Sequence, residues 1–208
     1  MIKHSGMDVD YCGISNQDDF YNYESIIQFK YKIIDTAKQL SKICNFITDY
    51  KTELDYDWYM KIRPDIKLLD NINFDTGTGD GTGDGDGKVP ILSKNAINGR
   101  ARIYNGPSKI KYGMSINGED CFYSDHEHNI LIDDQIYIFH NNVVQQNAFN
   151  KIDPNMSYEN AWNKTAPDLQ SEPAHTEIFN NRNISLNIIG INCLMSKYHV
   201  FSGHINME

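Results

Sequence analysis

The chain contains few cysteines and no long apolar run, and each absence argues against a class of protein. Its four cysteines, Cys12, Cys44, Cys121 and Cys193, are far apart and form neither a Cys-x-x-Cys pair nor a Cys/His spacing typical of a metal site. Free thiols in a reducing compartment are therefore expected, not a disulfide framework or a zinc module. No stretch approaches the ~18 apolar residues of a membrane span, and residues 1–6 hold no apolar core of a signal peptide. We expect a cytoplasmic protein with no membrane span.

Positive charge is also scarce. The 19 Lys and Arg residues are outnumbered by 28 Asp and Glu residues, which gives a net charge of −9. This balance argues against nucleic acid or an anionic membrane as the main partner. A length of 208 residues suits one domain, and 13 tyrosines with only 40% hydrophobic residues predict that much of the core is aromatic or half-polar. We therefore expect a single globular domain over residues 1–208.

Residues 76–87 lack any apolar side chain and alternate glycine with threonine or aspartate. Such a segment has no apolar surface to bury, so a flexible Gly/Asp-rich loop is predicted over residues 75–88. Calcium-binding repeats of similar composition need a periodic apolar residue, and an EF-hand needs a terminal glutamate. Neither is present here.

Residues 58–62 alternate apolar and polar side chains, a period of two that predicts a strand. Pro64 cannot donate to a sheet, so the strand should end there and leave Arg63 and Asp65 just beyond its carboxyl edge. Ligands bind at this edge in open α/β sheets. The alternative is that the arginine and the aspartate only satisfy a turn.

Helical periodicity appears on both sides of this strand. Apolar residues at three- and four-residue steps predict a helix over 24–50, following an irregular or edge segment at 1–23. Ser171 as a cap and Pro173 in the first turn predict a second helix to about residue 181. The apolar stretch over 184–191 predicts a further strand. Helices alternating with strands indicate an α/β fold.

The segment from Lys88 to Gly118 contains no acidic residue. Arg100 and Arg102 would share one face of a strand, and guanidinium groups suit phosphate or carboxylate ligands. The alternative is a solvated strand face paired with acids elsewhere. A turn at residues 105–108 predicts that residues 100–113 form a hairpin.

Asp133 and Asp134 interrupt an otherwise apolar stretch at 130–139. Burying a carboxylate is costly without a partner or a metal, so this pair needs a reason to be there. Adjacent aspartates repel, which can raise one pKa toward that of a general base or create a cation site. The alternative is that one of them caps a helix.

Three segments in this order resemble GT-A-type glycosyltransferase-like proteins, including uncharacterised proteins of giant DNA viruses. They are Tyr-Asp-Trp-Tyr-Met-Lys-Ile-Arg-Pro-Asp-Ile at 56–66, Ile-Asp-Asp-Gln-Ile-Tyr-Ile-Phe at 132–139 and Ser-Glu-Pro-Ala-His-Thr-Glu-Ile-Phe at 171–179. The resemblance covers residues 24–200. It implies a GT-A-like mixed sheet flanked by helices, truncated at its N-terminus. It also implies sugar transfer from a nucleotide sugar to a glycan or protein acceptor, in the host cytoplasm or a viral factory if the chain is viral.

The resemblance also assigns roles to residues. Arg63 and Asp65 correspond to the Asp-x-Asp motif that holds the donor diphosphate through Mn²⁺ or Mg²⁺, with Asp65 as the metal ligand and Arg63 in place of the first aspartate. The basic residues Arg100 and Arg102 join them as donor-phosphate candidates.

On the acceptor side, Asp133 or Asp134 would deprotonate the attacking hydroxyl, and Glu172 would line the acceptor pocket. The short segment before residue 24 favours an alternative, a non-catalytic relative that binds glycans or acts as a structural interaction protein.

Overall fold

The structure is a computed structural model that describes residues 7–37, 39–64, 66–69, 72–74, 91–105, 112–116, 119–123, 128–152, 171–191, 193–195 and 200–201. Within these ranges it describes only the backbone for residues 101–131, 171–174, 193–195 and 200–201. The Gly/Asp-rich loop predicted at 75–88 lies outside the described residues. No helix in the described ranges is long and apolar enough to cross a membrane.

The largest sheet in the described residues has six strands in the order β3-β8-β5-β9-β6-β7, and we call it the central sheet. Its strands are β3 (Trp58–Ile62), β5 (Ala96–Asn105), β6 (Tyr112–Ile116), β7 (Glu119–Tyr123), β8 (His128–His140) and β9 (Ser185–Ile188). β9 runs parallel to β5 and β6, whereas the other neighbours are antiparallel. The predicted α/β class is confirmed at this level, and its GT-A arrangement stays a prediction.

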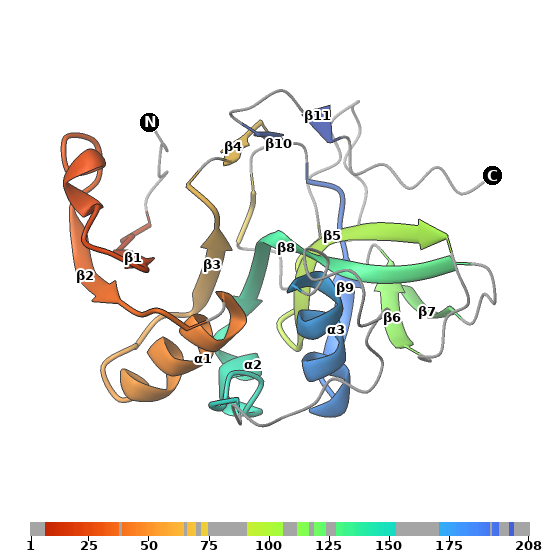
Figure 1. Ribbon diagram of the computed structural model, residues 1–208. Coiled ribbons are helices and arrows are strands. Elements are labelled where there is room, and N and C mark those ends of the chain that lie inside the picture. Colours follow the sequence, from red (N-terminus) through yellow and green to blue (C-terminus); the bar gives the residue numbers. More distant parts are fainter. Residues whose placement is uncertain are drawn as a thin grey trace.

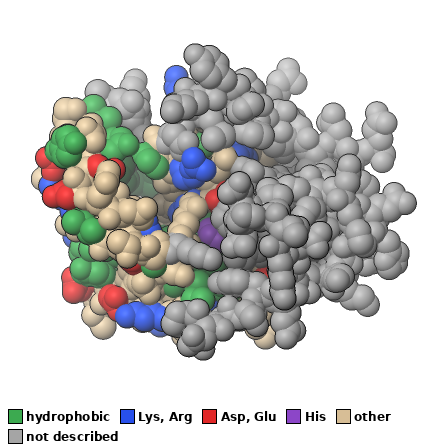
Figure 2. All heavy atoms as spheres, in the orientation of Figure 1, with side chains coloured by type: hydrophobic (Ala, Val, Ile, Leu, Met, Phe, Trp, Pro, Cys, Tyr) green, Lys and Arg blue, Asp and Glu red, His purple; other side chains and the backbone are tan. Residues whose placement is uncertain are grey.

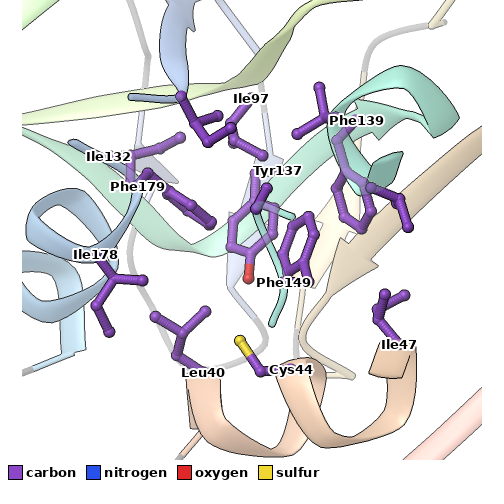
Figure 3. Packing of buried hydrophobic residues seen from close by; sticks show 14 of the residues in the cluster. Leu40, Cys44, Ile47, Ile97, Ile132, Tyr137, Phe139, Phe149, Ile178 and Phe179 are labelled. Atoms are coloured by element: carbon purple, nitrogen blue, oxygen red, sulfur yellow. The ribbon is translucent and has the colours of Figure 1, made fainter. Parts of the chain in front are cut away.

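Three helices cover one face of the central sheet (Figure 1). They are α1 (Gln39–Asp49), α2 (Asn141–Gln145) and α3 (Ser171–Asn181). Their apolar side chains meet those of β5, β8 and β9 in the main core, where Tyr137 and Phe139 of β8 pack against Phe149 and Phe179 (Figure 3). This arrangement confirms the helix predicted from Ser171. We call this side of the sheet the helix face.

The opposite face carries a smaller core. Ile136 and Ile138 of β8 join Leu92, Ile189 and Ile191 there, with Trp58, Met60 and Ile62 of β3 packed against them. β3 spans the predicted strand, and its alternation places these three side chains away from the helices.

A two-stranded parallel ribbon precedes the central sheet, with β1 (Tyr11–Ser15), the short helix η1 (Phe20–Asn22) and β2 (Phe29–Ile34). Figure 1 shows it at the left edge of the molecule. Tyr31 attaches it to Phe46 of α1 and to Tyr50, the residue after α1, with ring centroids 5.6 and 5.1 Å away. The helix predicted over 24–50 is therefore wrong in its first half. β2 alternates outward and inward side chains, and this period of two prevails over the helical spacing.

The hairpin predicted at 100–113 is also wrong. β5 and β6 are not neighbours, because β9 lies between them and pairs with both. A small sheet of β4 (Ile66–Leu68), β10 (Cys193–Met195) and β11 (Val200–Phe201) completes the described strands. The single domain over 1–208 stays a prediction.

Candidate functional site

The pairing of β5 with β8 contains a large irregularity. Gly99 lies opposite Tyr137, and Ala101 lies opposite Ile132, so Arg100 alone faces the four residues 133–136. We call residues 133–136 the β8 bulge. In a regular strand, Ile132 and Tyr137 would point to opposite faces of the sheet, because they are five residues apart. The extra residues of the bulge reverse this alternation, so both side chains enter the main core. The predicted aspartate pair therefore lies inside a strand, and the alternative of a helix cap is wrong.

Arg100 holds the β8 bulge from inside the sheet. Its guanidinium forms an ion pair with Asp133 and donates to Gln135 Oε1 over 3.1 Å. Asp133 also accepts from the backbone N–H of Gln135 over 3.0 Å. Arg100 is only 3% exposed and Asp133 only 1%, so the pair is shielded from solvent. Both side chains that were predicted to meet ligands are engaged with each other.

The β8 bulge is joined to the end of β3. The backbone N–H of Arg63 donates to the carbonyl oxygen of Gln135 over 3.1 Å, and the N–H of Ile66 returns to the carbonyl oxygen of Arg63 over 3.1 Å to close a turn. We call residues 63–65 the β3 corner. The structure thus brings together the two motifs that the sequence singled out, although Asp65 itself lies outside the described residues.

Asp134 belongs to the helix-face side of the β8 bulge. Its carbonyl oxygen accepts from the side chain of Gln39, the first residue of α1, over 3.1 Å. Its carboxylate is close enough to raise the pKa of Tyr137 and to oppose the lowering of the pKa of His175. Asp134 is 5% exposed. It therefore lies under the helices, at the boundary between the sheet and α3.

Three further polar side chains surround this position. Lys61 of β3 lies over the Tyr137 ring, with Nζ 5.6 Å from the ring centroid, and the rings of Tyr137 and His175 are 5.8 Å apart. Burial and, to a lesser extent, the positive charge of Lys61 together lower the pKa of His175 to about 3. Burial is also the main reason why the pKa of Tyr137 is raised. In Figure 2, basic, acidic and histidine side chains are visible close together near the middle of the view.

The remaining predicted residues are placed only by their backbone. Arg102 lies on β5 opposite Leu131, and Glu172 lies in the first turn of α3. Neither side chain belongs to the described part of the structure. Their predicted roles in phosphate binding and in an acceptor pocket remain predictions.

The residues that could hold a metal were also predicted from sequence. Among the described residues there is no group of three or more His, Cys, Asp or Glu side chains that could bind a metal ion. A cation held between a substrate diphosphate and one carboxylate does not need such a group. The prediction of Mn²⁺ or Mg²⁺ at Asp65 therefore stays open.

Sequence reasoning missed Lys61, Tyr137 and His175. A signal for His175 was available, because it precedes Ile178 and Phe179 by three and four residues and so lies on the buried stripe of α3. Lys61 shares the face of Tyr59 and Arg63 by the period of two along β3. Its contact with Tyr137 depends on pairing between distant strands, which no local pattern reveals.

Comparison with known proteins gives no match: no protein-family model, no curated protein and no solved structure is similar to the chain. The arguments about function therefore rest on the geometry of the chain itself.

Proposed function

We propose that the chain is a glycosyltransferase-like protein that transfers a sugar from a nucleotide-sugar donor to a glycan or protein acceptor. The observation that carries this proposal is the hydrogen bond from the Arg63 N–H to the Gln135 carbonyl oxygen. It holds the β3 corner, which carries Arg63 and Asp65, against the β8 bulge, which carries Asp133 and Asp134. Ligands bind at the carboxyl ends of strands in open α/β sheets, and fixed charges there can stabilise the charge that develops during transfer.

The geometry supports different roles for the two aspartates. Asp133 is paired with Arg100 and with the N–H of Gln135, so in this proposal both are positioning residues that hold the β8 bulge. Asp134 faces the helices with Lys61 and His175 nearby, and we assign it as the base that takes the proton of the acceptor hydroxyl. Glu172 remains the candidate for the acceptor pocket.

On the donor side, Arg63 and Asp65 are the candidates for binding the diphosphate, with Arg102 as a further basic group. Asp65 would serve as a ligand for Mn²⁺ or Mg²⁺, which would offset the negative charge of the leaving diphosphate. Arg63 supplies a fixed positive charge at the same corner. This charge would stabilise the leaving diphosphate in the same way as the cation would.

A thermal-stability series with UDP- and GDP-sugars in the presence of Mn²⁺ tests the proposal. A donor at a hundredfold excess over its Kd should raise the melting temperature by about 5 °C or more, because it binds only the folded state. Asp65→Ala should abolish the rise, whereas Asp55→Ala, a change in an exposed linker residue, should leave it intact. Absence of a shift across the whole panel would contradict donor binding.

A non-catalytic role in glycan binding or structural interaction is the second candidate, and one observation favours it. Among the described residues, most of the strongly exposed large hydrophobic side chains lie between residues 7 and 34, in or beside the N-terminal ribbon. They are Met7, Val9, Tyr21, Ile26 and Ile34. This candidate would be selected by two results together: the wild type binds itself or a partner and Ile34→Lys does not, and no donor is turned over.

A further inference from the structure

His175 is a buried histidine whose polar atoms are not satisfied. It is 1% exposed, and its ring lies 5.8 Å from that of Tyr137 and 6.5 Å from that of Phe179. Neither ring nitrogen has a hydrogen-bond partner among the described residues. Buried polar groups are nearly always paired, so an imidazole in this setting needs an explanation.

The charges that face His175 come from both strands beneath it. Lys61 of β3 contributes a positive charge, and Asp134 of β8 contributes a negative one that is the weaker influence. Tyr137 of β8 is neutral, and the thiol of Cys44 on α1, beyond Tyr137, has its pKa raised by burial to about 11. The strand β9, residues 185–188, has no titratable side chain. On α3 itself, the acidic residue next to His175 among the described side chains is Glu177, two positions along the helix.

The N-terminal half of α3 is attached to the sheet close to this histidine. The N–H of Ile132 donates to Thr176 Oγ1 over 2.9 Å, one residue before the β8 bulge begins. The other end of α3 has its own anchor, because Arg182 donates to the carbonyl oxygen of Ala148 over 2.6 Å. The two halves of α3 therefore have separate anchors, and opening of the half that carries His175 breaks the Thr176 hydrogen bond but not that of Arg182.

We propose that α3 is an acid-released cover over Asp134, and that protonation of His175 separates the N-terminal half of the helix from the central sheet. An imidazolium there would add a second positive charge beside Lys61 in an apolar core. Burying that charge without a partner is costly, which favours the open state of the helix at low pH. The inference rests on packing alone and holds whether or not the chain transfers sugars.

Hydrogen exchange of the full chain at pH 7.5 and pH 5, corrected for intrinsic exchange rates, tests the proposal. The pKa of His175 is near 6.5 when the helix is open and near 3 when it is closed. The equilibrium population of the open state should therefore rise on the order of 30-fold from pH 7.5 to pH 5. Peptides from β8, residues 136–140, should show no comparable increase. His140→Asn, which keeps a side-chain cap on α2, should respond to pH as the wild type does.

Two variants remove the titrating group in different ways. His175→Phe keeps an aromatic ring against Tyr137 and Phe179, and His175→Gln keeps a polar side chain. In both variants, the corrected hydrogen-exchange rate of α3 should become independent of pH. If neither variant folds, the pH dependence of exchange in α3 and in β8 of the wild type still tests the proposal. A pH response that persists in a folded variant, or a wild-type response that spreads equally to β8, would overturn the proposal.

Discussion

Arg100 and Asp133 form a buried ion pair at the place where one residue of β5 faces four residues of β8. The pair fills the gap that the extra residues leave in the sheet. It also leaves Asp134 on the helix face and the Gln135 carbonyl oxygen toward the β3 corner. The geometry of the candidate site therefore depends on an interaction that need not touch any ligand.

Removing one member of this pair should destabilise the fold strongly. Arg100→Met or Asp133→Leu leaves an uncompensated buried charge, which typically costs about 3–5 kcal/mol of unfolding free energy. The double variant should recover much of this loss, because no charge then remains buried. Urea unfolding of the two single variants and the double variant measures the coupling.

The exposed pair of Lys151 and Asp49 provides the control. Its side chains are 54% and 51% exposed, so Lys151→Met should change the unfolding free energy by less than about 1 kcal/mol. Equal losses at the exposed and the buried pair would show that burial is not what makes Arg100 important.

Gly99 should not tolerate a side chain. A Cβ at this position would lie 3.0 and 3.1 Å from side-chain carbons of Ile132 and 3.2 Å from Cβ of Tyr137, directly beside the β8 bulge. Gly99→Ala should therefore lower the unfolding free energy by about 1–3 kcal/mol, and Gly99→Val by more. Thermal unfolding of both variants checks this, and a stabilised Gly99→Ala would mean that the bulge can move.

Local patterns predicted the elements whose side chains repeat regularly. The alternation in residues 58–62 gave the extent of β3, and Ser171 with Pro173 gave the start of α3. The helix predicted from residue 24 failed in its first half because residues 29–34 satisfy both periods. Aromatic and β-branched side chains there favour the strand that packs on α1.

The candidate site was predictable only in part. The β3 corner and the aspartate pair were identified from sequence, because a proline ends the strand and acids interrupt an apolar run. The partner of Asp133 was not, since Arg100 reaches it only through the register of two strands. In the same way, the insertion of β9 between β5 and β6 depends on pairing between distant segments, which no local pattern encodes.

Arg63 should contribute to donor affinity. Arg63→Gln removes a positive charge from the β3 corner and should weaken nucleotide-sugar binding about tenfold, since hydrogen bonds to charged groups contribute about 1.5–3 kcal/mol. Lys67→Gln removes an equal charge from an exposed position on β4 and should have little effect. Calorimetric titration of both variants makes the comparison. Equal affinities would remove Arg63 from the proposed donor site.

Acid should lower the stability of the whole chain. The pKa of His175 lies near 3 in the folded state and near 6.5 when unfolded, so below pH 6.5 the unfolded state binds more protons. The unfolding free energy should fall on the order of 2 kcal/mol between pH 7.5 and pH 5. Urea unfolding at both values measures this difference. His175→Phe should remove most of the fall, and an unchanged slope would assign it to other groups.

The central claim is that Asp134 acts on the attacking hydroxyl beside a donor held at the β3 corner. Turnover of a nucleotide sugar that binds, with water or a glycan as acceptor, tests it most directly in the wild type, Asp134→Asn and the exposed control Asp55→Asn. We predict that Asp134→Asn lowers kcat about 10²- to 10⁴-fold with donor affinity unchanged, while the control retains full activity. Turnover in Asp134→Asn equal to the wild type, or no turnover with any donor that binds, would contradict the account.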